Sequence, residues 1–529
     1  MRDDDRTGRL FESLRLPLPD VSARRLTGSV VLGLALGVAT VQPTVGQLQG
    51  SAGLRPSSSD PLPPVERIVL SNGLRLLLLP RAGAPTVSFV MQYAIGGVHE
   101  RSGETGVAHL LEHMLFKGTE TIGTTNLSAE LELFGAMDRL HTRAVEALAS
   151  GDSATARGLR AEIGELEDEA RAFVVGNEFD RILSRAGAQG LNATTTSEST
   201  SYFVELPANR AELFFALEAD RLSNPVFREF YTERDVVMEE RRMRVDASPG
   251  GALYERHLAA AFTAHPYGQP VVGFMADLER LGRADVERYY RAYYGPNNAV
   301  LAVVGDFDPT EAEAWARRYL EPIQRGEDAP PVGAVEPPQL EERRIEVTWD
   351  AEAALRIGWH VTDSQHEDAA AIAMLSAVLT GGRTSRLHRR LVTVERLAAS
   401  VFSSTGPGSR FAQLFQIDLT PVQAASVQEI ERAVYDEIRG LQEEGPTLEE
   451  IERVRNQIAA GRIRRLQSNL GLAFQIADAE SLFDDWRATF TAAERLRSVT
   501  SEDVRRVARE YLTSENRTVA ILRRSEETR

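Results

Sequence analysis

Residues 285–304, DVERYYRAYYGPNNAVLAVV, are echoed 218 residues later by residues 503–522, DVRRVAREYLTSENRTVAIL. Each stretch reads as a helix with a tyrosine near its end, Tyr293 or Tyr511, followed by a turn containing an asparagine. A run of apolar and β-branched residues then predicts a strand. The chain is therefore predicted to contain two homologous halves, each combining helices with a sheet.

A second, weaker echo extends the repeat toward the start of each half. Val87–Tyr93 and the segment around His109 match Ala354–His360 and Ala369–Leu379. Between the halves lies a stretch rich in Pro, Gly and Glu, which favours an extended, solvated connection. The sequence therefore predicts a first domain at residues 65–318, a linker at residues 319–343 and a second domain at residues 344–529.

One segment of the first domain has a different composition. Residues 139–178 are dense in Ala, Glu and Arg, with a break at Ser150-Gly151-Asp152. We expect a helical hairpin inserted into the first domain. A solvated insertion without any chemical role is the simpler interpretation.

Composition excludes several classes of protein. The chain has 529 residues, of which 43% are hydrophobic and 26% charged, as in soluble globular proteins of more than one domain. The formal net charge of −17 disfavours nucleic acid as a partner, because phosphate binding needs a basic surface. There is no cysteine, so any protein-bound metal must be held by His, Asp or Glu.

The amino end resembles a signal peptide. Arg24 and Arg25 precede the apolar run Ser29–Val41, and a polar stretch follows. We expect a signal peptide at residues 1–47, a linker at residues 48–64, and export to a periplasmic or extracellular space. The apolar run is shorter than the roughly 20 residues that span a bilayer, so no stable membrane insertion is expected after signal removal. An uncleaved, weakly anchored helix is the alternative.

The chemical signal is the pentapeptide His109-Leu110-Leu111-Glu112-His113. On a helix, its two imidazoles lie one turn apart on the same face, where both can bind one zinc ion. Glu112 is placed to take a proton from a zinc-bound water and pass it to a leaving amine. Two helix histidines held by ordinary hydrogen bonds are the non-catalytic alternative.

The surrounding residues 106–119, GVAHLLEHMLFKGT, resemble the signature of the pitrilysin/insulinase family of metallopeptidases. Further matching segments follow in the order found in that family: Leu191–Ala193 with Thr196 and Tyr202, then Glu233–Glu240, then His265–Gly268. The resemblance implies that Glu240 is the third zinc ligand and that Glu233 supports the site. Glu239 is the competing ligand if the register differs by one residue.

The resemblance also assigns residues to the substrate. Asn192 and Ala193 match an edge strand of the family whose backbone pairs with an extended peptide; an ordinary strand and turn is the alternative. The spacing of 127 residues between His113 and Glu240 is longer than is usual in the family. The Ala/Glu/Arg-rich insertion accounts for the excess.

The second half departs from the family pattern. Laid on the repeat, the metal positions become Ile372, Leu375 and Ser376, so one zinc per chain is expected. In the family this half supplies an arginine and a tyrosine near the scissile bond, and here those positions are Val392 and Ala399. We therefore expect a dimer, with a homologous partner chain supplying the Arg/Tyr pair. A homodimer using Arg389, Arg390 or Arg396 is the alternative.

The resemblance, combined with the repeat, implies an α+β fold of two homologous domains, each a mainly antiparallel sheet packed with helices. The expected function is a zinc endopeptidase acting on short or unfolded peptides, with Glu112 as general base. A non-catalytic subunit of a larger complex is the second hypothesis. Metal-dependent hydrolysis of a non-peptide bond is a weaker third.

Overall fold

The computed structural model describes residues 62–423, 425–465 and 467–525. The predicted signal peptide and almost all of the linker at residues 48–64 lie outside the described residues. Among the residues described, no helix is long and apolar enough to cross a bilayer.

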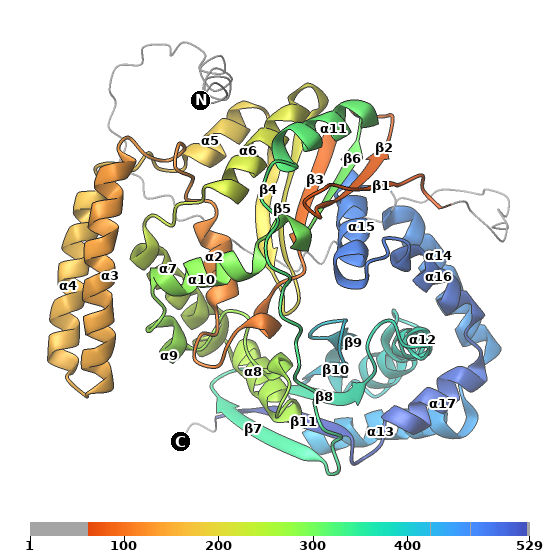
Figure 1. The fold of residues 1–529 in the computed structure, drawn as a ribbon. Helices are drawn as coiled ribbons and strands as arrows, with labels where there is room; N and C mark the ends of the chain where they lie inside the picture. Colours follow the sequence, from red (N-terminus) through yellow and green to blue (C-terminus); the bar gives the residue numbers. More distant parts are fainter. Residues whose placement is uncertain (1–61, 424, 466, 526–529) are drawn as a thin grey trace, which may run out of the picture. The chain divides into compact units, whose positions relative to one another are not determined.

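Two sheets organise the chain, one in each half (Figure 1). The strands of the first half are β1 Glu66–Val69, β2 Arg75–Pro80, β3 Thr86–Tyr93, β4 Gln189–Thr195, β5 Thr200–Pro207 and β6 Ala299–Gly305. Its helices are α2 Val107–Met114, α3 Leu127–Ala149, α4 Ser153–Ala170, α5 Glu178–Arg185, α6 Ala211–Ser223, α7 Phe230–Arg241, α8 Pro249–Ala261, α9 Met275–Leu278, α10 Arg283–Tyr293 and α11 Pro309–Trp315.

The second half repeats the pattern with fewer elements. Its strands are β7 Arg343–Trp349, β8 Ala354–Val361, β9 Ala398–Gly406, β10 Gln413–Pro421 and β11 Arg517–Arg524. Its helices are α12 Ala369–Thr380, α13 Val427–Glu444, α14 Leu448–Arg465, α15 Asn469–Phe483, α16 Ala488–Ser498 and α17 Ser501–Tyr511. No helix or strand lies between residues 321 and 342, where the sequence predicted an extended connection.

Sheet topology confirms that the halves are homologous. The first sheet has the order β1-β2-β6-β3-β5-β4 and the second β7-β11-β8-β10-β9, so the second matches the first without β1. In both sheets one neighbouring pair is parallel, β2 with β6 and β7 with β11, and every other pair is antiparallel. The prediction of an α+β fold with mainly antiparallel sheets is confirmed.

The residues of the sequence echo have the same roles in both halves. The side chain of Asn298 donates to the Tyr293 carbonyl at 3.0 Å, and that of Asn516 donates to the Tyr511 carbonyl at 2.7 Å. Each bond satisfies a carbonyl at the end of a helix that has no partner within the helix. The 218-residue offset therefore records a shared helix-to-strand turn.

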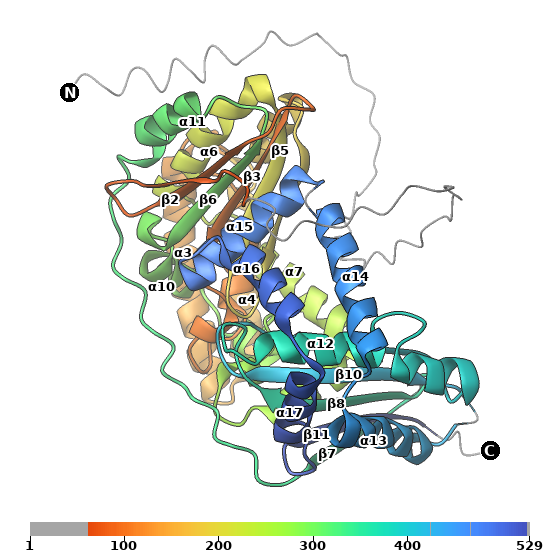
Figure 2. The same ribbon diagram turned by 90° about the vertical axis from the view of Figure 1, so that its right-hand side faces the viewer.

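One helix from each half packs on the sheet of the other half. Helix α15 of the second half packs on the first sheet, where Leu472 and Ile476 join Val90 and Val300 in one buried cluster (Figure 2). Helix α8 of the first half packs on the second sheet through Leu253. Both helices start with a serine whose hydroxyl accepts from the amide three residues later, Gly251 or Gly471. The exchange ties the halves together.

A buried carboxylate links the halves at a further point. Glu198, in the turn between β4 and β5, accepts hydrogen bonds from the backbone amides of Ser409 and Arg410, each at 2.8 Å. The hydroxyl of Tyr267 donates to the same carboxylate. Glu198 is only 3% exposed, so separating the halves would leave its carboxylate without the two amide donors of the second half.

The expected helical hairpin is present as α3 and α4, with its turn at residues 150–152. The predicted start near Arg139 is wrong, because α3 begins at Leu127 and Arg139 lies in its middle. Phe134 and Met137 of the first turns are buried, 5% and 1% exposed. The first turns of α3 therefore have the composition of a core helix. For this reason the sequence did not show that they continue into the Ala/Glu/Arg-rich insertion.

The N-terminal part of α3 is fastened by a fully buried ion pair. The Arg228 guanidinium lies 3.3 Å from the Glu130 carboxylate, and both side chains are 0% exposed. Arg228 also donates to the carbonyls of Lys117, Thr119 and Ile122 in the loop after α2. The pair thus fixes both the hairpin and the loop that follows the His109 helix.

We expect Glu130→Ala to lower the free energy of unfolding by about 3–5 kcal/mol, because it leaves the buried Arg228 charge without its carboxylate. Urea titration followed by circular dichroism measures the change.

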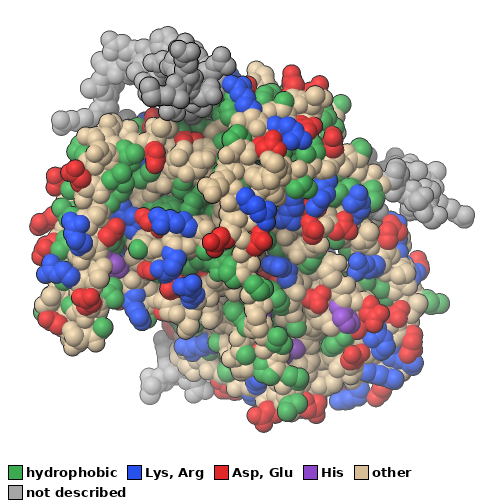
Figure 3. Space-filling view, in the orientation of Figure 1, with side chains coloured by type: hydrophobic (Ala, Val, Ile, Leu, Met, Phe, Trp, Pro, Cys, Tyr) green, Lys and Arg blue, Asp and Glu red, His purple; other side chains and the backbone are tan. Residues whose placement is uncertain are grey.

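Basic and acidic side chains are interspersed over the face shown in Figure 3. Exposed pairs such as Arg291 with Glu287 contribute only about 0–1 kcal/mol. Arg291→Met is therefore the control, and equal losses in the two variants would contradict the prediction.

Candidate metal centre

Helix α2 carries the two histidines. His109 and His113 lie one turn apart, with ring centroids 4.9 Å from each other. The helix follows Gly106, whose φ of 89° is left-handed and which offers no capping side chain. Glu100 replaces the cap, accepting from the amides of Gly106 and Ala108 at 2.9 Å each. Burial raises the pKa of Glu100 to about 8, against the lowering effect of these two donors.

Helix α7 brings the distant carboxylate to the same place. Glu240 Oε1 lies 3.6 Å from His109 Nε2, and Glu240 Oε2 lies 3.5 Å from His113 Nε2. Ligand atoms of these three residues all lie within 4.8 Å of one another. No other group of three or more such side chains with this spacing occurs among the described residues.

The geometry of these three residues fits zinc. Tetrahedral zinc with bonds of roughly 2.0–2.1 Å separates its ligand atoms by about 3.3 Å, close to both measured His–Glu distances. Two neutral imidazoles and one carboxylate are the donor set of several catalytic zinc sites, which leave the fourth position to water. His109, His113 and Glu240 therefore form a suitable three-ligand set.

Helix register decides between the two neighbouring glutamates. Glu239 pairs with Arg242 at 2.9 Å, and its side chain is 58% exposed. Glu240 is 13% exposed and faces the imidazoles. The alternative register, with Glu239 at the histidines, is not the one the structure adopts.

Glu233 lies behind His113. Its Oε2 atom is 3.4 Å from His113 Nδ1, and its Oε1 atom is 2.5 Å from the Lys117 ammonium. A carboxylate at Nδ1 keeps the proton there, which leaves Nε2 free as a ligand and fixes the ring orientation. Burial would raise the pKa of Glu233, but His113 and Lys117 outweigh it and lower the pKa.

The charges of the ligand set are strongly coupled. Burial lowers the pKa of His109 to about 3, with His113 adding to the effect. Burial also opposes a charge on His113, yet its hydrogen bonds to Glu233 and Glu240 raise its pKa to about 9. Burial would raise the pKa of Glu240, but the His113 bond and the charges of His109 and Arg244 lower it to about 2. Without metal, His113 is therefore protonated at neutral pH.

Glu112 points to a different neighbour. It is 9% exposed and accepts a hydrogen bond of 2.6 Å from the hydroxyl of Thr195, the last residue of β4. Burial raises the pKa of Glu112, and the Thr195 bond only partly opposes this. A carboxylate with a raised pKa is a better proton acceptor. The bond also holds Glu112 beside the end of the edge strand.

Three further contacts of the site were not assigned from the sequence. Thr195 contacts Glu112, Lys117 contacts Glu233, and Arg244 contacts Glu240 at 2.6 Å. Arg244 lies in the wide helical turn Arg242–Asp246 that continues α7. Lys117 is part of the quoted run, so its nearness to the histidines was a usable signal. Thr195 and Arg244 carry no such pattern.

Strand β4 forms an edge of the first sheet. It pairs with β5 through Asn192 with Phe203 and Ala193 with Tyr202, and no strand of the described chain pairs with its other side. The Ala193 amide donates to the Asn192 side chain at 2.8 Å. The two residues predicted to meet substrate therefore lie on an open edge, three and two residues before Thr195.

The described residues of the second half hold no equivalent site. Ile372 and Leu375 of α12, at the positions matching His109 and Glu112, are buried in the apolar core of that half. Ser376 shares a 2.7 Å hydrogen bond with Ser403. Val392 packs against the same core, whereas Ala399 is exposed on strand β9. Ile372, Leu375 and Val392 therefore serve packing, and none of the five side chains is a usual zinc ligand.

Comparison with known proteins gives the following similarities. The sequence profile described as Insulinase (Peptidase family M16) matches residues 76–147 and 174–273, and the Peptidase M16 inactive domain matches residues 280–458. Zinc protease PqqE of Helicobacter pylori is 29% identical over 349 residues, covering 65% of this chain and 67% of that protein. An uncharacterized zinc protease of Streptomyces coelicolor is 24% identical over 458 residues, covering 85% and 87%.

A crystal structure of a protease from Helicobacter pylori has a similar fold. Its TM-score is 0.74 at 25% identity, covering 87% of this chain and all of that one. The Insulinase match is interrupted at residues 148–173, a stretch that contains α4. The insertion isolated by composition is therefore also where this chain departs from the profile.

Proposed function

This chain belongs to the insulinase family, peptidase family M16, and from that premise we propose that it is a zinc-dependent endopeptidase. The family resemblance of residues 106–119 is confirmed by the profile match. The observation that carries the proposal is the convergence of His109, His113 and Glu240, with ligand atoms within 4.8 Å. Glu112 beside them supplies the general base.

The residues have distinct roles in the proposed reaction. His109, His113 and Glu240 would hold one zinc ion, and Glu233 would keep His113 in the tautomer that binds it. When bound, zinc supplies a Lewis acid that polarises the scissile carbonyl and makes a water more acidic. Glu112 takes the proton of the attacking water and returns it to the leaving amine. Thr195 holds Glu112 in place through its 2.6 Å hydrogen bond.

The substrate proposed for this site is a short or unfolded peptide bound as an extra strand. The open edge of β4 supports this, because an extended chain can pair with free backbone groups there. Asn192 and Ala193 would contact it, and the strand ends at Thr195, beside Glu112. A short or unfolded peptide can adopt the extended conformation that this pairing requires.

A partner chain completes the proposal. Val392 and Ala399 cannot donate hydrogen bonds from their side chains to the developing negative charge. Arg390 is already paired with Glu395 and contacts Asp436 and Glu437, which disfavours it as a substitute. We propose a dimer, of which the favoured form pairs this chain with a homologous subunit that carries the Arg/Tyr pair.

Purifying the chain alone tests this division between subunits. We expect weak cleavage of a fluorogenic peptide library by the zinc-loaded chain and a rise of about 100- to 1000-fold when the complementary subunit is added. Size-exclusion chromatography with light scattering reports the oligomer in each sample. Full activity of the chain by itself would refute the need for a second kind of subunit and leave the homodimer.

The second candidate is a non-catalytic subunit, which the match of residues 280–458 to the inactive domain permits. It predicts less than about one zinc per chain after mild purification and no activity on adding zinc. The intact ligand set favours the enzyme.

We further propose export to a periplasmic or extracellular space, on the basis of the signal-like segment Arg24–Val41. Detection of the protein in a periplasmic or culture fraction tests it.

A further inference from the structure

Helix α7, which carries Glu233 and Glu240, has no capping side chain of its own. It starts after Glu229, whose φ of 56° is left-handed and whose side chain makes no capping bond. The first amides of a helix have no partners within it, so an uncapped helix end is easily frayed or shifted. The position of its first turn must therefore be fixed from outside.

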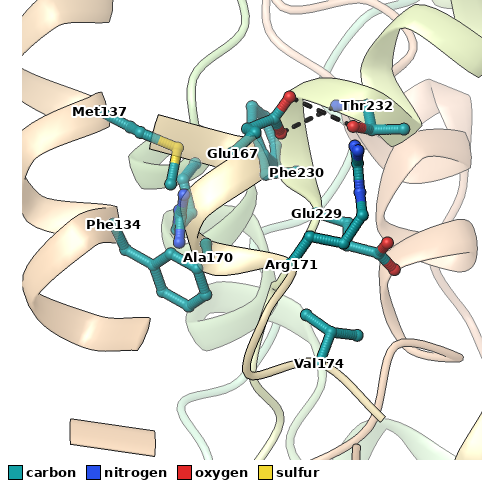
Figure 4. Close-up of a pocket in the computed structure, with 10 residues that line it drawn as sticks. Phe134, Met137, Glu167, Ala170, Arg171, Val174, Glu229, Phe230 and Thr232 are labelled. Carbon is teal, nitrogen blue, oxygen red and sulfur yellow. Dashed lines mark hydrogen bonds between the residues drawn. The ribbon is translucent and has the colours of Figure 1, made fainter. Parts of the chain in front are cut away.

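The hairpin provides the missing cap. Glu167 of α4 accepts from the backbone amide and from the hydroxyl of Thr232, each at 3.1 Å. Figure 4 shows the two bonds, with Glu167 reaching across a small pocket to the first turn of α7. The amide of Thr232 is one of those that lack a partner, and a carboxylate at a helix N-terminus also complements the helix dipole.

A second bond fastens the same turn to the other helix of the hairpin. The Tyr231 hydroxyl donates to Asp138 of α3 at 3.1 Å. Phe230 is 0% exposed and lines the pocket together with Phe134 and Met137 of α3. Both helices of the hairpin thus hold three successive residues of α7.

The held turn leads directly to the site. Glu233 follows Thr232, and Glu240 lies two helical turns further along α7. A rigid helix transmits any displacement of its first turn to both carboxylates. The other ligand helix, α2, is built on the same plan, since Glu100 caps it from outside.

We propose that the hairpin α3–α4 positions the ligand helix α7, with Glu167 as the positioning residue. Glu167 lies within residues 148–173, where this chain departs from the family profile. The insertion therefore has a structural role at the metal centre, because it sets the distance between Glu240 and the two imidazoles. The inference rests on the proposed zinc site, but not on peptidase activity.

The test measures zinc affinity of the full-length chain by competition with a fluorescent chelator. We expect Glu167→Ala to weaken zinc binding about 10-fold, in the range typical of residues that support a ligand from behind. Tyr231→Phe should weaken binding by a smaller factor, because it removes only the Asp138 bond. Glu165→Ala is the matched control, an exposed glutamate on the same helix, and should leave the affinity unchanged.

Hydrogen exchange of the amides of residues 231–234 is the second measurement, made without zinc. Faster exchange in Glu167→Ala, together with weaker zinc binding and rescue by Glu167→Gln, supports the proposal, because the amide oxygen of glutamine can still accept from the Thr232 backbone amide. Wild-type affinity in Glu167→Ala overturns the positioning role and leaves the zinc site intact. Absence of zinc binding by the wild-type chain overturns both this inference and the proposed function.

Discussion

Glu112→Gln is expected to retain zinc while reducing peptide cleavage by about 100- to 10,000-fold. The substitution keeps the size of the side chain, and its amide oxygen can still accept the hydrogen bond from Thr195. What it removes is the ability to take a proton from the attacking water. Glu112 is not one of the three residues whose ligand atoms converge, so the metal should remain.

Measuring zinc content and kcat on the same sample separates these effects. Glu120→Gln is the control, because Glu120 is an exposed carboxylate a few residues beyond α2. It should keep both zinc and activity. Unchanged turnover in Glu112→Gln would remove Glu112 from the role of general base, and lost zinc would show that it contributes to the metal site.

The local parts of the fold and site were predictable from sequence. The 218-residue echo predicted the order of helix and strand at the end of each half, and it aligned Asn298 with Asn516, whose side chains make the same bond in the structure. Imidazoles at positions i and i+4 of a helix must share a face. His109 and His113 could therefore be paired from the sequence alone.

Other features depend on contacts that no periodicity records. Amphipathic spacing shows that a helix buries one face, but not against which sheet, so the exchange of α8 and α15 was not foreseen. The contacts of Arg244 and Thr195 were missed for the same reason, because neither residue is among those that matched a motif. The hairpin was recognised by composition, while its links to α7 depend on Glu167 and Asp138, two acidic residues among many in that stretch.

Glu240→Ala is expected to weaken zinc binding by more than about 100-fold, which is beyond the range for residues outside the ligand set. The variant removes one of the three residues whose ligand atoms converge, and so leaves zinc with two imidazoles from the protein. Cleavage should fall with zinc content. Isothermal titration of the metal-free chain with zinc measures the affinity directly.

Glu239→Ala is the decisive control for Glu240→Ala. It removes a carboxylate from the neighbouring position of the same helix, where the side chain is 58% exposed and paired with Arg242. A general effect of lost charge or helix stability would weaken zinc binding in both variants, whereas a coordinating role confines the loss to Glu240. Because the two residues differ in direction by about 100° around the helix, only one of them can reach Nε2 of both imidazoles. If Glu239→Ala releases zinc and Glu240→Ala does not, the ligand set derived from the structure is wrong.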